Sequence, residues 1–130
     1  MSHYISVYLI RKEEIRDSKI ESVLENKKIG IKFKELGSNI LATTRIPNIK
    51  EFGIDKTIAK IETDYFGGSG QQSAKLFINN KKVYDKSSEQ DWSLNPINDV
   101  LKEMGVQRLD GQDEFDTIGL SKYRTNMDFN

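Results

Sequence analysis

A glycine-rich bend between two alternating segments constrains the fold of this chain more than any other feature. Apolar and polar residues alternate from Thr57 to Phe66, which is the period-two pattern of a β-strand. Gly67, Gly68 and Gly70 follow within four positions, and glycine is the residue that accepts positive φ or a close backbone approach. A second alternating segment covers Ser73 to Asn79. The stretch therefore predicts two antiparallel strands joined by a glycine-rich turn.

The glycines of this bend allow two interpretations. Successive backbone N–H groups in such a bend can cradle an anion. A phosphate-binding loop, however, opens a helix and usually carries a Lys-Ser or Lys-Thr pair, whereas Gly70 is followed by a strand pattern without that pair. We therefore interpret residues 67–70 as a wide hairpin turn.

Alternation also assigns the hairpin side chains to two faces of a sheet. One face of the first strand is mostly apolar and consists of Ala59, Ile61, Thr63 and Tyr65. The other face places Glu62 and Asp64 side by side, with Lys60 next to them. Two carboxylates on one face can act as a general acid and base, or as half of a metal site. Charges that alternate along a strand are more typical of a solvated face, and this is our interpretation.

Other segments extend the predicted sheet. Residues 4–10 are rich in β-branched and aromatic side chains and carry apolar residues on both faces, which predicts a strand inside the sheet. Residues 29–34 and 40–46 predict two strands around a turn at residues 37–39. Asn79-Asn80 predicts a tight turn, after which residues 82–85 return as a third strand of the hairpin.

Two segments predict helices. A capping box from Ser18 to Glu21 begins a short helix that ends near Lys28. Asn95 as the N-cap and Pro96 begin the second helix, and Gly105 ends it. The apolar stripe of this second helix consists of Ile97, Val100, Leu101 and Met104. Together the segments predict a single α+β domain spanning residues 1–130, with a mostly antiparallel sheet of about five or six strands and two helices packed on one face.

The composition of the 130-residue chain excludes several kinds of chemistry. It has no cysteine, which excludes disulfides, thiol catalysis and thiolate metal sites. The single histidine, His3, lies at a chain end where an imidazole is poorly held. No calcium-loop spacing is present. We therefore expect no catalytic residue, no metal and no cofactor.

The same composition limits the partners. No apolar run is long enough to cross a bilayer, and residues 1–10 form a strand pattern without the features of a signal peptide. No basic stripe with interleaved aromatic residues is present, as a nucleic-acid binder would have. We expect a protein partner in the cytoplasm, and neither a membrane nor a nucleic acid. The oligomeric state does not follow from the sequence.

Charge is unevenly distributed along a chain whose formal net charge is zero. Residues 1–88 carry 16 Lys and Arg against 11 Asp and Glu, whereas residues 89–130 carry 4 against 9. Residues 113–118 predict one helical turn with Phe115 and Ile118 facing inward. An outward-facing acidic cluster would then consist of Asp110, Asp113, Glu114 and Asp116. A solvated surface is the simplest interpretation, and a docking patch for a basic partner is the functional one.

Residues 61–74 also resemble the core motif of a family of small, uncharacterised bacterial proteins. The family pattern is a strand that ends in acidic-x-acidic-aromatic-Phe-Gly-Gly-x-Gly-x-Gln-x-Ala, followed by a helix and a Gly-Leu-x-x-Tyr/His-Arg tail. The tail corresponds to residues 119–124, and family members usually have a bulkier apolar residue at Ser69. The motif residues in this chain are Glu62, Asp64, Tyr65, Phe66, Gly67, Gly68, Gly70 and Gln72.

Members of that family are often encoded beside secreted polymorphic toxins. The resemblance therefore implies an immunity-like role, in which a small protein binds and neutralises a cognate toxin, and it implies no catalytic residue. Two other classes remain open. One is a small-ligand-binding protein or enzyme that uses Glu62 and Asp64 beside the glycine turn. The other is a structural module associated with a phage or a secretion system.

Overall fold

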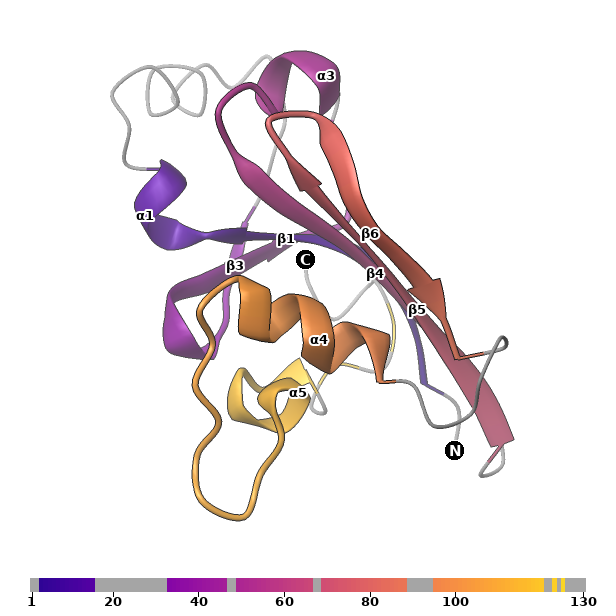
Figure 1. Cartoon of the computed structure of the whole chain (residues 1–130). Helices are drawn as coiled ribbons and strands as arrows, with labels where there is room; N and C mark the ends of the chain where they lie inside the picture. Colours follow the sequence, from indigo (N-terminus) through magenta and orange to yellow (C-terminus); the bar gives the residue numbers. More distant parts are fainter. Residues whose placement is uncertain are drawn as a thin grey trace.

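A six-stranded antiparallel sheet forms the framework of the protein, in the order β2-β3-β1-β4-β5-β6 (Figure 1). The computed structural model describes residues 3–15, 33–46, 49–66, 69–88, 95–120, 123 and 125. The strands are β1 (His3–Arg11), β2 (Lys34–Glu35), β3 (Ile40–Thr43), β4 (Thr57–Phe66), β5 (Ser69–Ile78) and β6 (Lys81–Ser87). The helices are α1 (Lys12–Ile15), the 3₁₀ turn η2 (Gly37–Asn39), α3 (Ile49–Phe52), α4 (Pro96–Glu103) and α5 (Glu114–Thr117).

The predicted α+β architecture is confirmed. Strand β1 lies between β3 and β4, as expected for a strand with apolar residues on both faces. Helices α4 and α5 lie on one face of the sheet (Figure 1). Of the predicted strand at residues 29–34, only residues 33 and 34 are described, and Lys34 begins the short β2. The predicted helix at residues 18–28 and the glycines Gly67 and Gly68 lie outside the described residues.

The central hairpin is confirmed, but its turn is tighter than predicted. Strand β5 begins at Ser69 and not at Ser73, so the ladder with β4 continues to the pair Phe66–Ser69. Gly70 therefore lies in a strand, opposite Tyr65, and the prediction of a wide turn through Gly70 was wrong. The physical reason is that glycine retains its N–H and C=O groups, so an antiparallel ladder can pass through it.

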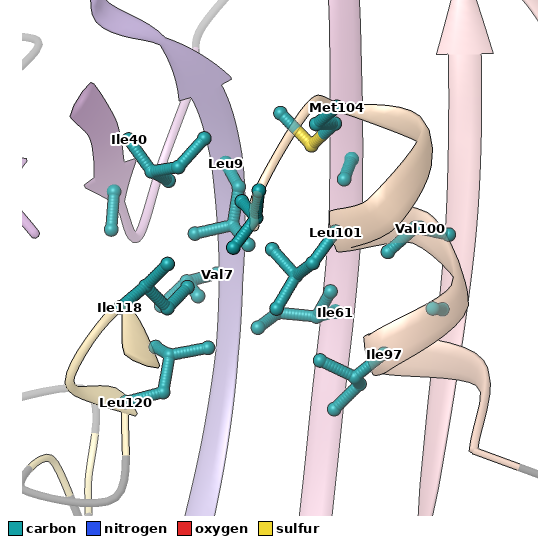
Figure 2. Close-up of a cluster of buried hydrophobic side chains, with 14 of the residues drawn as sticks. Val7, Leu9, Ile40, Ile61, Ile97, Val100, Leu101, Met104, Ile118 and Leu120 are labelled. Carbon is teal, nitrogen blue, oxygen red and sulfur yellow. The ribbon is translucent and has the colours of Figure 1, made fainter. Parts of the chain in front are cut away.

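The main core lies between the sheet and helix α4 (Figure 2). Val7 and Leu9 of β1 and Ile61 of β4 project toward the helix and are fully buried. The predicted stripe of α4 faces them and is buried along its length, at Ile97, Val100, Leu101 and Met104. Fully burying a side chain of this kind contributes about 1.5–3 kcal/mol relative to leaving it exposed. Gly105, at φ +89°, ends the helix as predicted.

A smaller apolar cluster covers one end of the opposite sheet face. Its members on the sheet, Ile10, Leu41 and Ile58, alternate along their strands with residues of the main core. Phe52 of α3 packs on them, with its ring 6.3 Å from that of Phe33. The rest of this second face is polar, because Lys60, Glu62 and Asp64 of β4 point to it. The sheet therefore has one face covered by α4 and α5, and one face covered only at its end within the described residues.

The Asn79-Asn80 turn adopts the predicted left-handed conformation. Asn79 has φ +50° and Asn80 has φ +66°, which suits a tight hairpin turn. The Asp55 backbone N–H donates to Asn79 Oδ1 at 2.9 Å, and Asn80 Nδ2 donates to the Lys50 carbonyl at 2.5 Å. The hairpin turn is thereby fixed to the turn that follows α3.

Candidate functional site: an acidic loop between two helices

The first candidate site, Glu62 with Asp64, lies on the polar face of the sheet. Both side chains are exposed, as expected for a solvated strand face. Ser6 Oγ donates to Glu62 Oε1 at 3.3 Å. Lys60 lies 4.2 Å from the centroid of the Tyr8 ring, and partial burial lowers the pKa of its amine, an effect that Glu62 partly offsets. In the part of the chain that the structure describes, both carboxylates are open to solvent, which does not favour their use as a general acid and base.

Gln72 of the motif has a structural role that the sequence did not reveal. Its side-chain Oε1 accepts from the Ile97 N–H at 3.1 Å, so β5 supplies the capping acceptor for the first turn of α4. Asn95 occupies the N-cap position as predicted, but its side chain makes no capping hydrogen bond. Gln72 also donates its backbone N–H to Ser88 Oγ at 2.9 Å. One motif residue therefore joins the hairpin to the helix and to the end of β6.

The other motif residues that the structure describes contribute backbone to the hairpin. Tyr65 and Phe66 end β4, and their partners in the ladder are Gly70 and Ser69. Thr63, between the two acidic residues, is buried, and its Oγ1 accepts from the Ile5 N–H at 3.2 Å. The described motif residues thus pair the two strands, and their charged side chains lie on the exposed face of the sheet.

The acidic cluster is only partly as predicted. Asp110 and Asp116 are exposed and Asp113 is half-buried, but Glu114 is only 4% exposed, so the expectation that it points outward was wrong. Glu114 is the first residue of α5, and its Oε1 lies 3.8 Å from Lys102 Nζ of α4. The contact between the two helices therefore decides its orientation, which the residue spacing within α5 could not.

Asp113 holds the helix start. Its Oδ1 accepts from the Asp116 N–H at 2.8 Å, which is the N-cap hydrogen bond of α5. Its Oδ2 accepts from Asn98 Nδ2 at 3.1 Å, and Asn98 Oδ1 accepts in turn from the Phe115 N–H at 3.0 Å. Asn98 of α4 therefore clamps the first turn of α5 through both atoms of its amide. Its place in the helix sequence gave no signal for this role.

The loop between α4 and α5 is held at both ends and presents an apolar side chain. The Leu109 N–H donates to Thr117 Oγ1 at 3.0 Å, and the Leu109 carbonyl accepts from the Gln112 N–H at 3.1 Å. Gly111, at φ +76°, allows the chain to turn within this bond. The Leu109 side chain is 60% exposed beside Asp110. Residues 108–113 line a shallow hollow at this loop.

Asp110, Asp113 and Asp116, which are exposed or half-exposed, thus lie on or just after a hydrogen-bonded loop that presents one exposed leucine. Preformed acidic loops with an apolar side chain suit protein recognition, because charge guides the encounter and the apolar group supplies contact area. Over the residues that the structure describes, no group of three or more His, Cys, Asp or Glu side chains is arranged to hold a metal ion.

A scan against protein-family models, a search of curated proteins and a search of solved structures each gave no significant match. In the part of the chain that the structure describes, no helix is long and apolar enough to cross a membrane.

Proposed function

We propose that this protein is a non-enzymatic binding protein that neutralises a cognate bacterial toxin, as an immunity protein does. The observation that carries the proposal is the loop at residues 108–113, in which Leu109 is 60% exposed between Arg108 and Asp110, with Asp113 further along the loop. Asn98 donates a hydrogen bond to Asp113 and Thr117 accepts one from the Leu109 N–H, so the loop is held before any partner binds. Preorganisation of this kind lowers the entropic cost of association.

The roles of the four acidic residues differ in this proposal. Asp110 and Asp116 are exposed, so they attract a basic toxin surface during the encounter. Asp113 positions the loop through its two hydrogen bonds. Glu114 is buried against α4 and makes no contact with the partner.

The biological setting comes from the resemblance at residues 61–74 and 119–124 to proteins encoded beside secreted toxins. A chain without cysteine suits the reducing cytoplasm, which is where a toxin must be neutralised before it damages its own producer. We therefore place the proposed complex in the cytoplasm.

The function is tested with the C-terminal domain of the secreted protein encoded beside this chain. Its expression alone should stop growth, and co-expression of this chain should restore growth and yield a complex that survives two purification steps. Unprotected cells, together with no complex between the purified proteins, would rule out the immunity role.

The binding surface is tested by association kinetics at several salt concentrations. Replacing Asp110 and Asp116 by Asn should lower the association rate about 3–10-fold at low salt and weaken its salt dependence, because steering depends on exposed charge. The matched control, Glu62→Gln with Asp64→Asn, changes the net charge equally on the polar sheet face and should have a smaller effect. Equal slowing in both variants would show that net charge, and not this loop, guides the encounter.

A further inference from the structure

The end of the molecule at the β5–β6 turn carries an unusual share of exposed apolar surface. We call residues 50–56 and 78–83 the turn end. Three of the five exposed large hydrophobic residues in the described chain lie there, Ile54, Ile78 and Val83, each about half exposed at 47–50%. The segments are neighbours, because the Asp55 N–H donates to the side chain of Asn79. Exposed apolar side chains in two segments that are held together offer area for a contact with a partner.

Lysines surround this apolar patch. The turn end contains four lysines against two acidic residues, and Lys50, Lys81 and Lys82 are exposed. Lys82 Nζ lies 2.9 Å from Asp85 Oδ2. Lys50 and Lys81 are exposed at the surface of the turn end. A partner for this surface should therefore present an apolar side chain together with carboxylates.

The acidic loop of the same protein has that chemistry. Residues 107–116 contain four acidic residues against one arginine, and Leu109 is the most exposed of the large hydrophobic side chains described. The loop lies at the opposite end of the molecule from the β5–β6 turn (Figure 1). One molecule therefore carries a surface at one end that complements the surface at its other end.

We propose that the turn end is a docking surface for the acidic loop of a second copy of this chain. Leu109 of one copy would cover Ile54, Ile78 and Val83 of the next, and Asp110 and Asp116 would face Lys50 and Lys81. Both surfaces are already fixed by hydrogen bonds, so docking orders little additional chain. Because the two surfaces lie at opposite ends, the contact is head-to-tail and builds short linear chains of molecules.

The association is weak and sensitive to salt. A contact between one short loop and the turn end is small, and interfaces below about 1,200 Å² are typical of weak, transient encounters, so we expect a dissociation constant on the order of 0.1–1 mM. Exposed charges are screened within about 3 Å at 1 M salt, so high salt should dissociate the assemblies into monomers. The sedimentation coefficient should therefore rise with protein concentration at low salt and stay constant at high salt.

The test is a charge-swap experiment by sedimentation velocity on the full chain, without any toxin, so that its outcome is independent of the proposed function. One variant reverses the acidic loop (Asp110→Lys with Asp116→Lys), and a second reverses the turn end (Lys50→Glu with Lys81→Glu). Each variant alone has two ends of like charge and should stay monomeric. An equimolar mixture should associate again, because the unaltered turn end of the first fits the unaltered loop of the second.

A third variant controls for net charge. Glu62→Lys with Asp64→Lys makes the same charge change as the first variant on the polar sheet face, and it should still associate. Circular dichroism and thermal unfolding establish that each variant is folded. A wild-type protein that remains monomeric at about 1 mM in low salt would overturn the proposal, given the expected affinity. Association that persists in either single variant, or that does not return in the mixture, would overturn it as well.

Discussion

The two ends of this molecule are both closed by asparagine side chains, yet they are anchored differently. At the acidic end, Asn98 clamps α5, and the segment behind it enters the core through Ile118 and Leu120, which are 1% and 0% exposed. At the turn end, Asn79 and Asn80 fix the backbone while Ile78 is 47% exposed. The acidic end therefore contributes buried residues to the main core, whereas the turn end leaves Ile54, Ile78 and Val83 about half exposed.

This difference matters for how each end can vary. Substitutions in the segment around α5 change packing, because its residues contact both α4 and η2. The Gly37 N–H donates to the Ile118 carbonyl at 2.9 Å, and a Cβ at Gly37 would lie 2.8 Å from the Thr117 carbonyl oxygen. Such a close approach accepts only glycine without a shift of the backbone. At the turn end, by contrast, Ile54, Ile78 and Val83 are about half exposed, so these three side chains can change with less effect on packing.

The largest expected difference is in the free energy of unfolding, between variants of one buried and one half-exposed isoleucine. Ile118→Ala at the acidic end should lower the free energy of unfolding by about 2–4 kcal/mol, because it leaves a cavity in the core. Ile78→Ala at the turn end should lower it by less than about 1 kcal/mol, because the side chain is already half in water. Urea denaturation followed by circular dichroism measures both. Similar losses in the two variants would show that the ends are anchored alike.

The next comparison concerns the asparagines. Asn98→Ala should lower the free energy of unfolding by about 1–3 kcal/mol, because it removes the hydrogen bond to Asp113 Oδ2 and the one from the Phe115 N–H in a half-buried contact. Asn80→Gly keeps the positive φ and removes one exposed hydrogen bond, so it should cost less than about 1 kcal/mol. Hydrogen exchange at the Phe115 amide should accelerate in Asn98→Ala alone. An unchanged exchange rate there would refute the clamp.

The smallest expected effect is on the pH dependence of stability and concerns Tyr84, which lies between the two ends. Its hydroxyl on β6 donates to Asp99 Oδ2 of α4 at 2.8 Å. Burial, followed by the hydrogen bond and the charge of Asp99, raises the pKa of Tyr84 above its ordinary value of 10.0. The folded state thus holds this proton more tightly than the unfolded state, so its contribution to stability is complete below pH 10.0 and falls as the pH rises beyond it.

Tyr84→Phe should therefore lose less stability than the wild type between neutral and strongly alkaline pH. Chemical denaturation of both proteins across this range measures the difference, in which the alkaline titration of Lys60 is common to both. Parallel pH profiles would mean that Tyr84 titrates alike in the folded and unfolded states.

Much of the site could be predicted from the sequence, but the orientation of its side chains could not. The single turn at residues 113–118, the inward Ile118 and the acidic composition of the loop followed from local patterns. Glu114 did not, because a four-residue helix has side chains on all sides and only its neighbour α4 decides which one is buried. The capping of α4 by Gln72 was equally inaccessible, since the two residues that bond are 25 positions apart.

By itself, the sequence determined the periodic elements of this protein: the alternating strands of the hairpin and the buried stripe of α4. These follow from the backbone geometry of strands and helices, which each residue experiences through its near neighbours. Only the tertiary structure decided that Gly70 joins a strand, that Glu114 turns inward, and that the acidic loop and the lysine-rich turn occupy opposite ends. Those outcomes depend on contacts between segments distant in the chain, and no local spacing encodes them.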